Sequence, residues 1–169
     1  MLPSTKRHLS HCQGYLELGM KDDAHDELEK IEWEDRLKKE VLSARIQVYI
    51  KAKYWELVGA IAKQLSKRFP EESEWWLYWA YGARRAESLD LAKGILLEAL
   101  KRFPDNATIL YNLGCYACVD ESYDIASALV KRAIELDKDF QSLAIADKDL
   151  ANLWENVESE CDSSQASKT

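Results

Sequence analysis

The sequence predicts an all-α protein, a solenoid of about four helical hairpins followed by a C-terminal capping helix. The main observation is a spacing of 34 residues that recurs along the chain. Four series of small or apolar residues keep this spacing: Cys12, Ile46, Ala80 and Gly114; Ala24, Val58, Ala92 and Ala126; Leu28, Ala62, Leu96 and Val130; Ile31, Leu65, Ala99 and Ala133. In addition, six glycines and three prolines are few for a loop-rich chain. Because a helical hairpin buries its apolar stripe by stacking on a copy of itself, this period predicts a stacked array.

The 34-residue register divides the chain into four units of two helices each. The units are expected at about 5–38, 39–72, 73–106 and 107–140. The helices are expected at 5–18 and 21–33, 38–51 and 54–68, 73–86 and 89–102, and 107–120 and 123–136. Trp76, Trp79 and Ala80 follow the spacing of a helix that buries one face. Pro70 and Pro104 are expected to end the second helices of their units, because proline disfavours helical angles in the residue before it.

The repeat positions carry a family resemblance. In the fourth unit they are Ala107, Leu110, Leu113, Gly114, Ala117, Tyr123, Ala126, Val130 and Ala133. In the third they are Trp76, Trp79, Ala80, Ala83, Leu89, Ala92, Leu96, Ala99 and Pro104. Over residues 5–140 the chain resembles the tetratricopeptide repeat (TPR) family, whose unit is a 34-residue helix–turn–helix. The first unit departs from the pattern at His8 and His11, and it has Arg36 at the place of the closing proline. The resemblance implies a right-handed α-solenoid whose first helices line a concave groove.

The repeat pattern stops after the fourth unit, where a stacked array needs a cap with one polar face. We expect this cap at 141–160, with Asp147 accepting the free amides of a helix at about 148–160. Its apolar stripe would consist of Leu150, Leu153, Trp154 and Val157. The segment resembles one that closes bacterial members of the family. The sequence thus predicts one array domain over 1–160 and a disordered tail over 161–169, which has no large apolar residue.

Composition bounds the function. The net charge of −7 disfavours nucleic-acid binding, which needs a basic face. No apolar stretch approaches the roughly 18 residues of a membrane span, and the first residues lack the apolar region of a signal peptide. Four cysteines in a chain of 169 residues indicate free thiols rather than a disulfide framework. We therefore expect a cytoplasmic protein with no membrane insertion, either a monomer or a weak dimer.

The TPR resemblance implies which residues line the groove. The candidate partner-binding residues are Gln47, Lys51, Leu77, Tyr78, Tyr81, Arg84, Arg85, Tyr111 and Asn112. Aromatic rings beside arginines are enriched among residues that dominate protein interfaces. The alternative is that Tyr78 and Tyr81 only pack against neighbouring first helices. A clamp for chaperone carboxylates, known in some family members, is disfavoured because Leu9 and Gln13 stand where lysine and asparagine would be needed.

The segment 74–81 is the densest aromatic stretch of the chain. Trp76 and Trp79 fall on predicted core positions, whereas Trp75 falls off that stripe and is expected to be exposed. An aromatic cage for a quaternary amine is the functional alternative, but core packing explains most of the cluster more simply.

Two further patterns are candidates for chemical sites. Cys115 and Cys118 form a C-x-x-C spacing in the middle of a helix, where they are more simply small packing residues than a redox pair. His8, His11 and Cys12 share one helical face at a spacing that can bind a metal, but no supporting carboxylate can be identified in the sequence. We expect neither a metal nor a cofactor.

No nucleophile motif or glycine-rich phosphate loop is present in the sequence, and the chain has only three histidines. We therefore do not expect an enzyme. The leading hypothesis is a non-catalytic scaffold that binds a protein or peptide segment in the concave groove. The alternative is a secretion- or assembly-type chaperone that shields an apolar client segment.

Overall fold

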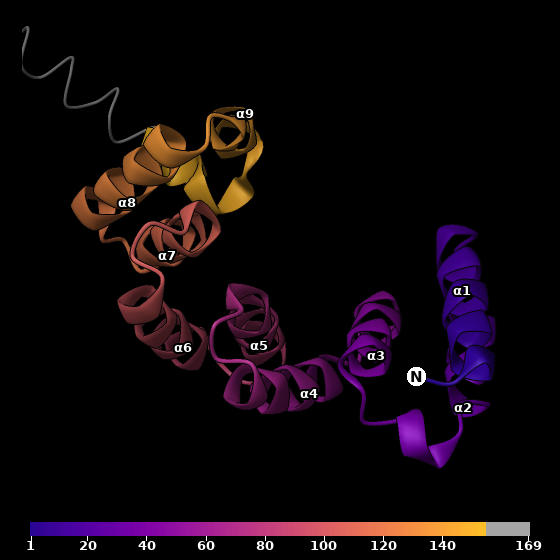
Figure 1. The fold of residues 1–169 in the computed structure, drawn as a ribbon. Coiled ribbons are helices and arrows are strands. Elements are labelled where there is room, and N and C mark those ends of the chain that lie inside the picture. The colour runs from indigo at the N-terminus through magenta and orange to yellow at the C-terminus, as the bar shows by residue number, and fades with distance from the viewer. Residues whose placement is uncertain (155–169) are drawn as a thin grey trace, which may run out of the picture. The chain divides into compact units, whose positions relative to one another are not determined.

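The computed structural model describes residues 1–154, and in these residues the predicted all-α fold is confirmed (Figure 1). The chain divides into two compact units, one from Met1 to Ile95 and a second that begins at Leu96. The first holds α1 (Pro3–Glu17), α2 (Lys21–Glu29), the 3-10 helix η1 (Trp33–Asp35), α3 (Lys39–Ala52), α4 (Trp55–Arg68) and α5 (Ser73–Ala86). Helix α6 (Leu89–Arg102) crosses the boundary. The second holds α7 (Ala107–Val119), α8 (Tyr123–Leu136), α9 (Asp139–Ala146) and the 3-10 helix η2 (Lys148–Leu150).

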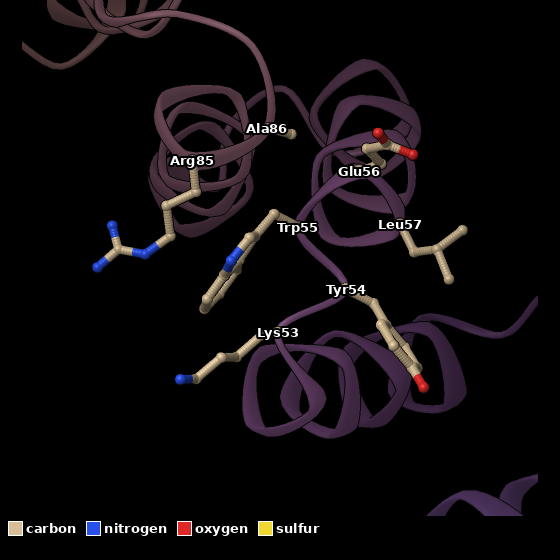
Figure 2. Close-up of a pocket in the computed structure, with 7 residues that line it drawn as sticks. All are labelled: Lys53, Tyr54, Trp55, Glu56, Leu57, Arg85 and Ala86. Carbon is tan, nitrogen blue, oxygen red and sulfur yellow. The ribbon is translucent and has the colours of Figure 1, made fainter.

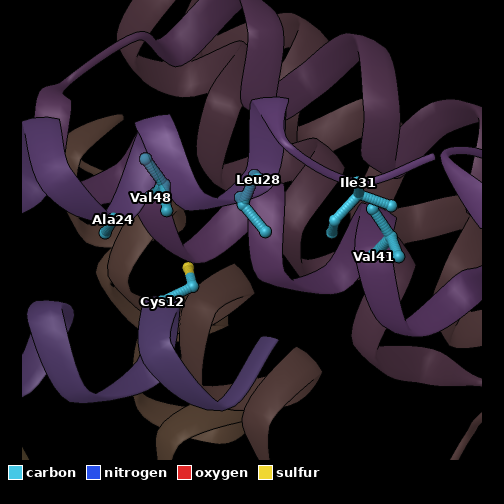
Figure 3. Close-up of a cluster of buried hydrophobic side chains, with 6 residues drawn as sticks. All are labelled: Cys12, Ala24, Leu28, Ile31, Val41 and Val48. Carbon is cyan, nitrogen blue, oxygen red and sulfur yellow. The ribbon is translucent and has the colours of Figure 1, made fainter. Parts of the chain in front are cut away.

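The 34-residue register is confirmed by burial, because every residue of the four sequence series is buried. In the first compact unit, Cys12 of α1, Leu28 of α2, Ile31 and Val41 belong to one cluster of buried side chains (Figure 3). Small residues of the series lie where helices cross, and Ala92 and Ala126 have no exposed surface. The expectation that all four units form a single array domain stays a prediction.

Two glycines mark close helix crossings. A Cβ atom at Gly82 of α5 would lie 2.7 Å from the backbone nitrogen of Gly59 and 2.9 Å from the carbonyl oxygen of Trp55, both on α4. In the second compact unit, which begins at Leu96, a Cβ atom at Gly114 of α7 would lie 2.7 Å from a methyl carbon of Val130 on α8. Because real Cβ atoms do not approach other atoms this closely, the backbones of α4 and α5 leave no room for a side chain at Gly82.

The second helix is shorter than the predicted range of 21–33. Helix α2 ends at Glu29, and the chain then turns into η1. The guanidinium of Arg36, which stands at the place of the closing proline, donates to the carbonyl oxygens of Ile31 and Glu29, each at 2.9 Å. The Arg36 side chain thus satisfies carbonyls near the helix end that no helical N–H reaches.

The buried carboxylate of Asp35 holds this turn in place. It accepts a hydrogen bond from the backbone N–H of Leu2 at 2.6 Å and pairs with the Lys38 ammonium at 2.5 Å. These two interactions lower the pKa of Asp35, with the Lys38 contact contributing most. The turn after α2 is therefore tied to the start of α1.

The predicted exposure of Trp75 is wrong. Its ring is only 3 % exposed and packs with Leu42 and Ile46 of α3, and its Nε1–H donates to the Glu72 carboxylate at 2.9 Å. Trp76, on the predicted stripe, is buried as well. The start of α5 thus buries side chains beyond one stripe, because it contacts both α3 and α4.

The cap begins differently from the prediction. A separate helix, α9, precedes the predicted one, and the Asp147 carboxylate then accepts the N–H of Asp149 at 3.0 Å, as predicted for a cap. Leu150 and Leu153 are buried, whereas Trp154 is only partly buried and donates from Nε1 to the carbonyl of Ala144 at 3.0 Å. Val157, the predicted end of the cap and the predicted tail lie outside the described residues.

No helix among residues 1–154 is both long enough and apolar enough to cross a membrane.

Candidate partner-binding surface

Two neighbouring first helices, α3 and α5, carry most of the predicted binding residues. We call this the α3–α5 surface and define it by the following residues: Gln47, Lys51, Leu77, Tyr78, Tyr81, Arg84 and Arg85. Lys51 and Arg85 are exposed, and the other five are partly buried. The surface therefore combines accessible cations with rings that are already held by the fold.

A hydrogen bond joins the two helices on this surface. The side-chain amide of Gln47 on α3 donates to the hydroxyl oxygen of Tyr78 on α5 at 2.7 Å. Burial raises the pKa of Tyr78, so the hydroxyl keeps its proton. Gln47 and Tyr78, which the sequence assigns to one predicted groove, are thus in direct contact.

One helical turn further along α5, Tyr81 and Arg85 form an aromatic and cationic cluster with Trp55 of α4. The rings of Tyr81 and Trp55 meet edge to face, with centroids 5.5 Å apart. The Arg85 guanidinium carbon lies 4.1 Å from the centroid of Tyr81 and 5.1 Å from that of Trp55. Such contacts restrict the arginine side chain before any partner arrives.

Beside this cluster lies a surface pocket of about 580 Å³, which we call the Trp55 pocket (Figure 2). Its lining residues are Lys53, Tyr54, Trp55, Glu56, Leu57, Arg85 and Ala86. They come from the α3–α4 turn, the first turn of α4 and the end of α5. The pocket thus lies where a first helix turns into a second, next to Arg85 of the α3–α5 surface.

The remaining predicted residues, Tyr111 and Asn112, belong to the second unit. Tyr111 is buried, stacks against Phe140 of α9 with centroids 4.8 Å apart, and donates from its hydroxyl to Asp147 at 2.9 Å. Asn112 donates to the carbonyl of Thr108 within its own helix at 2.8 Å. The C-terminal segment therefore covers Tyr111, and a partner would reach this ring only if that segment moved.

Cys115 lies in the same buried cluster as Tyr111. Its thiol sulfur is 3.6 Å from the Asp147 carboxylate, and burial, reinforced by that carboxylate, raises the pKa of Cys115 to about 12. Cys118 is buried too. A thiol with a raised pKa is a poor nucleophile, which agrees with the packing role expected for the C-x-x-C pair.

The histidines of the first unit face a carboxylate that the sequence does not reveal as their neighbour. Nδ1 of His8 lies 2.8 Å from a carboxylate oxygen of Glu27, and Nδ1 of His11 lies 3.4 Å from the same oxygen. Lys30 contacts the other oxygen at 2.6 Å. Within residues 1–154, no group of three or more potential ligands is arranged to hold a metal ion. Glu27 instead forms a buried ion-pair and hydrogen-bond network.

This network predicts a pH dependence of stability. The hydrogen bonds from His8 and then Lys30 lower the pKa of Glu27 from 4.5 to about 2. A lowered pKa stabilises the fold fully above pH 4.5, and this stabilisation is lost as the pH falls towards 2. Melting temperatures of the wild type and Glu27→Gln should therefore differ most above pH 4.5 and converge as the pH falls towards 2.

The exposed residue Glu34 provides the control, because the melting temperatures of the wild type and Glu34→Gln should stay close at every pH. A gap between wild type and Glu27→Gln that does not narrow on acidification would contradict the role of the network.

Sequence reasoning misses part of the Trp55 pocket. Trp55 matches a repeat position in the sequence, and neither Lys53 nor Tyr54 is a predicted site residue. The available signal is the run of a cation and two aromatic residues, Lys53 to Trp55, at the turn between two helices. A pattern of apolar periodicity does not record such a turn, because its residues belong to neither helical stripe.

Comparisons with known proteins confirm the fold. No protein-family model matches the sequence, and no curated protein matches it significantly. Among solved structures, the chain is similar to TTC0263, a thermophilic TPR protein in Thermus thermophilus, with a TM-score of 0.68 and 20 % identity over 90 % of this chain and 82 % of that one. It is also similar to MamA 41-end from Desulfovibrio magneticus RS-1, with a TM-score of 0.67 and 18 % identity over 100 % of this chain and 99 % of that one. The MamA RS-1 ArsTM double mutant gives 0.67 and 20 % identity over 99 % of both chains. The chain thus has the TPR fold found in these bacterial structures.

Proposed function

We propose that this chain, with its TPR fold, is a non-catalytic interaction module that binds a protein or peptide segment across the α3–α5 surface. The observation that carries the proposal is the set of partly exposed rings and accessible cations on adjacent first helices, already joined by the Gln47–Tyr78 hydrogen bond. Tyrosine and arginine in such settings contribute disproportionately to protein-interface affinity. Preorganised side chains also lose less conformational freedom on binding.

We further propose that the partner is a protein rather than a nucleic acid and that the module acts in the cytoplasm. A net charge of −7 argues for a protein partner over a nucleic acid. Cys12, Cys115 and Cys118 are buried free thiols, which agrees with a reducing compartment such as the cytoplasm. We propose a monomer or weak dimer in solution.

The test is to capture partners with the tagged full chain and to identify them by mass spectrometry. The affinity of each partner is then measured with purified components. Tyr81→Ala and Arg84→Ala should each cost about 1–2 kcal/mol of affinity with little change in melting temperature. The Arg84→Ala loss should shrink at high salt, because salt screens the attraction between this charge and an acidic group of a partner over about 8–10 Å. Lys63→Ala, on the second helix α4, serves as the control and should bind as the wild type does.

Two outcomes would redirect the proposal. If the Tyr81 and Arg84 variants melt earlier but bind the partner unchanged, these residues are structural and binding lies on another face. If the captured partner is an unfolded apolar segment that the module keeps soluble and then releases, the chaperone alternative holds in place of a scaffold.

A further inference from the structure

The Trp55 pocket concentrates positive charge on an acidic protein. Lys53 and Arg85 are both exposed, and within residues 1–154 neither pairs with a carboxylate. In Figure 2 their charged ends lie on the same side of the pocket, to the left of the Trp55 ring. The two cations thus form a local positive patch on a chain whose net charge is −7.

Arg85 contacts two aromatic rings but no carboxylate of residues 1–154. Its guanidinium carbon lies 4.1 Å from the centroid of the Tyr81 ring and 5.1 Å from that of the Trp55 ring. A stacked guanidinium keeps the N–H donors in its plane, and that planar fork matches the two oxygens of a carboxylate. Arg85 is thus held in place for a carboxylate that the described residues do not supply.

The single carboxylate in the pocket lining, that of Glu56, does not pair with Arg85 or Lys53. Glu56 lies in the first turn of α4, where a negative charge complements the helix dipole. In Figure 2 its side chain points away from the charged ends of Arg85 and Lys53. The cationic side of the pocket therefore remains open to an external acid.

The repeat itself does not require these cations. The residues one unit further along the 34-residue register are Glu87 in place of Lys53 and Val119 in place of Arg85. A feature needed to build the hairpin would recur at equivalent positions, as the buried residues do. One unit earlier the corresponding residues are Gly19 and Lys51, so only this junction has a cation at both positions. The combination of Lys53 and Arg85 is therefore not required to build the hairpin.

The opposite side of the pocket is apolar and accessible. Tyr54 is 54 % exposed and Leu57 is 46 % exposed, and both point away from the cationic side in Figure 2. An extended peptide places neighbouring side chains on opposite sides, so one residue can reach the cations while the next contacts Tyr54 and Leu57.

We propose that the Trp55 pocket binds an acidic segment of a protein partner, with a glutamate or aspartate side chain between Lys53 and Arg85 and an adjacent apolar side chain against Tyr54 and Leu57. This inference rests on the proposed function and specifies the chemistry of the partner. It extends the binding surface from Arg85, a predicted groove residue on α5, to Lys53 in the turn between α3 and α4, which is not a predicted groove residue.

The experiment uses the full chain and two synthetic probes, an acetylated and amidated hexapeptide of alternating glutamate and leucine and its glutamine counterpart. Binding is followed by NMR through the indole N–H of Trp55 and the Nε–H of Arg85, assigned by their loss in Trp55→Phe and Arg85→Gln. The glutamate peptide should shift both signals saturably, and the glutamine peptide should not. Arg85→Gln and Lys53→Gln should each weaken binding of the glutamate peptide by about tenfold, because each removes a charge-assisted hydrogen bond.

Lys63→Gln is the matched control. It also removes an exposed cation that lies over an aromatic ring, 5.2 Å from the Trp79 centroid, but outside the pocket. This variant should bind the glutamate peptide as tightly as the wild type. Melting curves of all variants separate loss of binding from loss of folding.

Three results would overturn the proposal: equal binding of the two peptides, unchanged affinity in Arg85→Gln and Lys53→Gln, or equal weakening by Lys63→Gln. If the amidated glutamate peptide does not bind but the same peptide with a free C-terminal carboxylate does, the ligand is a chain end and the proposed side-chain anchor is rejected. The proposed function fails separately. A captured partner that is lost from Tyr81→Ala or Arg84→Ala but retained by the Lys53→Gln, Arg85→Gln double variant would uphold the interaction module and reject the acidic anchor.

Discussion

Replacement of Gly82 with alanine is expected to destabilise the first unit by about 3 kcal/mol, at the upper end of the cost of over-packing. The added methyl group would lie 2.7 Å from the nitrogen of Gly59, 2.9 Å from its Cα and 2.9 Å from the carbonyl oxygen of Trp55. These are backbone atoms of α4, so no side-chain rotation can relieve the overlap. Urea unfolding of the full chain measures the change in the free energy of unfolding.

Gly59, on the other side of the same crossing, provides the control. A Cβ atom there would come no closer than 3.9 Å to its neighbours, an ordinary contact. Gly59→Ala should therefore be neutral or stabilising by about 0.5–1 kcal/mol, the usual gain from replacing glycine inside a helix. Equal destabilisation by the two substitutions would show that the approach of α4 and α5 differs from the one described.

Replacement of Leu150 with alanine is expected to destabilise the second unit by about 2–5 kcal/mol. Leu150 lies in η2, which packs against α7, and its side chain has no exposed surface. Removing it leaves a cavity beneath the C-terminal segment and weakens the cover over Tyr111. The free energy of unfolding from urea titrations measures the loss, and tyrosine or tryptophan fluorescence reports the exposure of the segment.

The control for this prediction lies in the same segment. Ile145 of α9 is 74 % exposed, so Ile145→Ala should change the free energy of unfolding by no more than about 0.5 kcal/mol. If Leu150→Ala is equally mild, then the segment that contains η2 does not stabilise the second unit as a cap.

The repeat makes most of the fold predictable. A residue in one series, such as Ala92 or Ala126, has equivalent neighbours in each unit, so the 34-residue spacing encodes both helices and their packing. The exceptions lie where the repeat is interrupted. The turn around Asp35 depends on contacts with Leu2 and Lys38 that no periodicity announces. The prediction for Trp75 is wrong because a single helical stripe does not describe a helix that contacts neighbours on two sides.

The sequence accounts for less of the candidate site than of the fold. The register positions of Gln47 and Tyr78 place them on one surface, and the hydrogen bond between them agrees with that placement. Trp55 completes the cluster from a second helix, and its position depends on the close crossing at Gly82 rather than on a motif. Tyr111 occupies a groove position in the register, but it is covered by a segment that follows the last repeat. The path of that segment cannot be derived from the repeat.

NMR mapping of the full chain, alone and with a captured partner, tests most directly whether the α3–α5 surface is the binding surface. The largest chemical-shift changes should fall on α3 and α5, including the side-chain amide of Gln47 and the backbone amides of Tyr78 and Tyr81. Saturable binding that leaves these signals unchanged and instead shifts the exposed residues of the second helices, such as Leu97 of α6 and Ile125 of α8, would contradict the proposed binding surface.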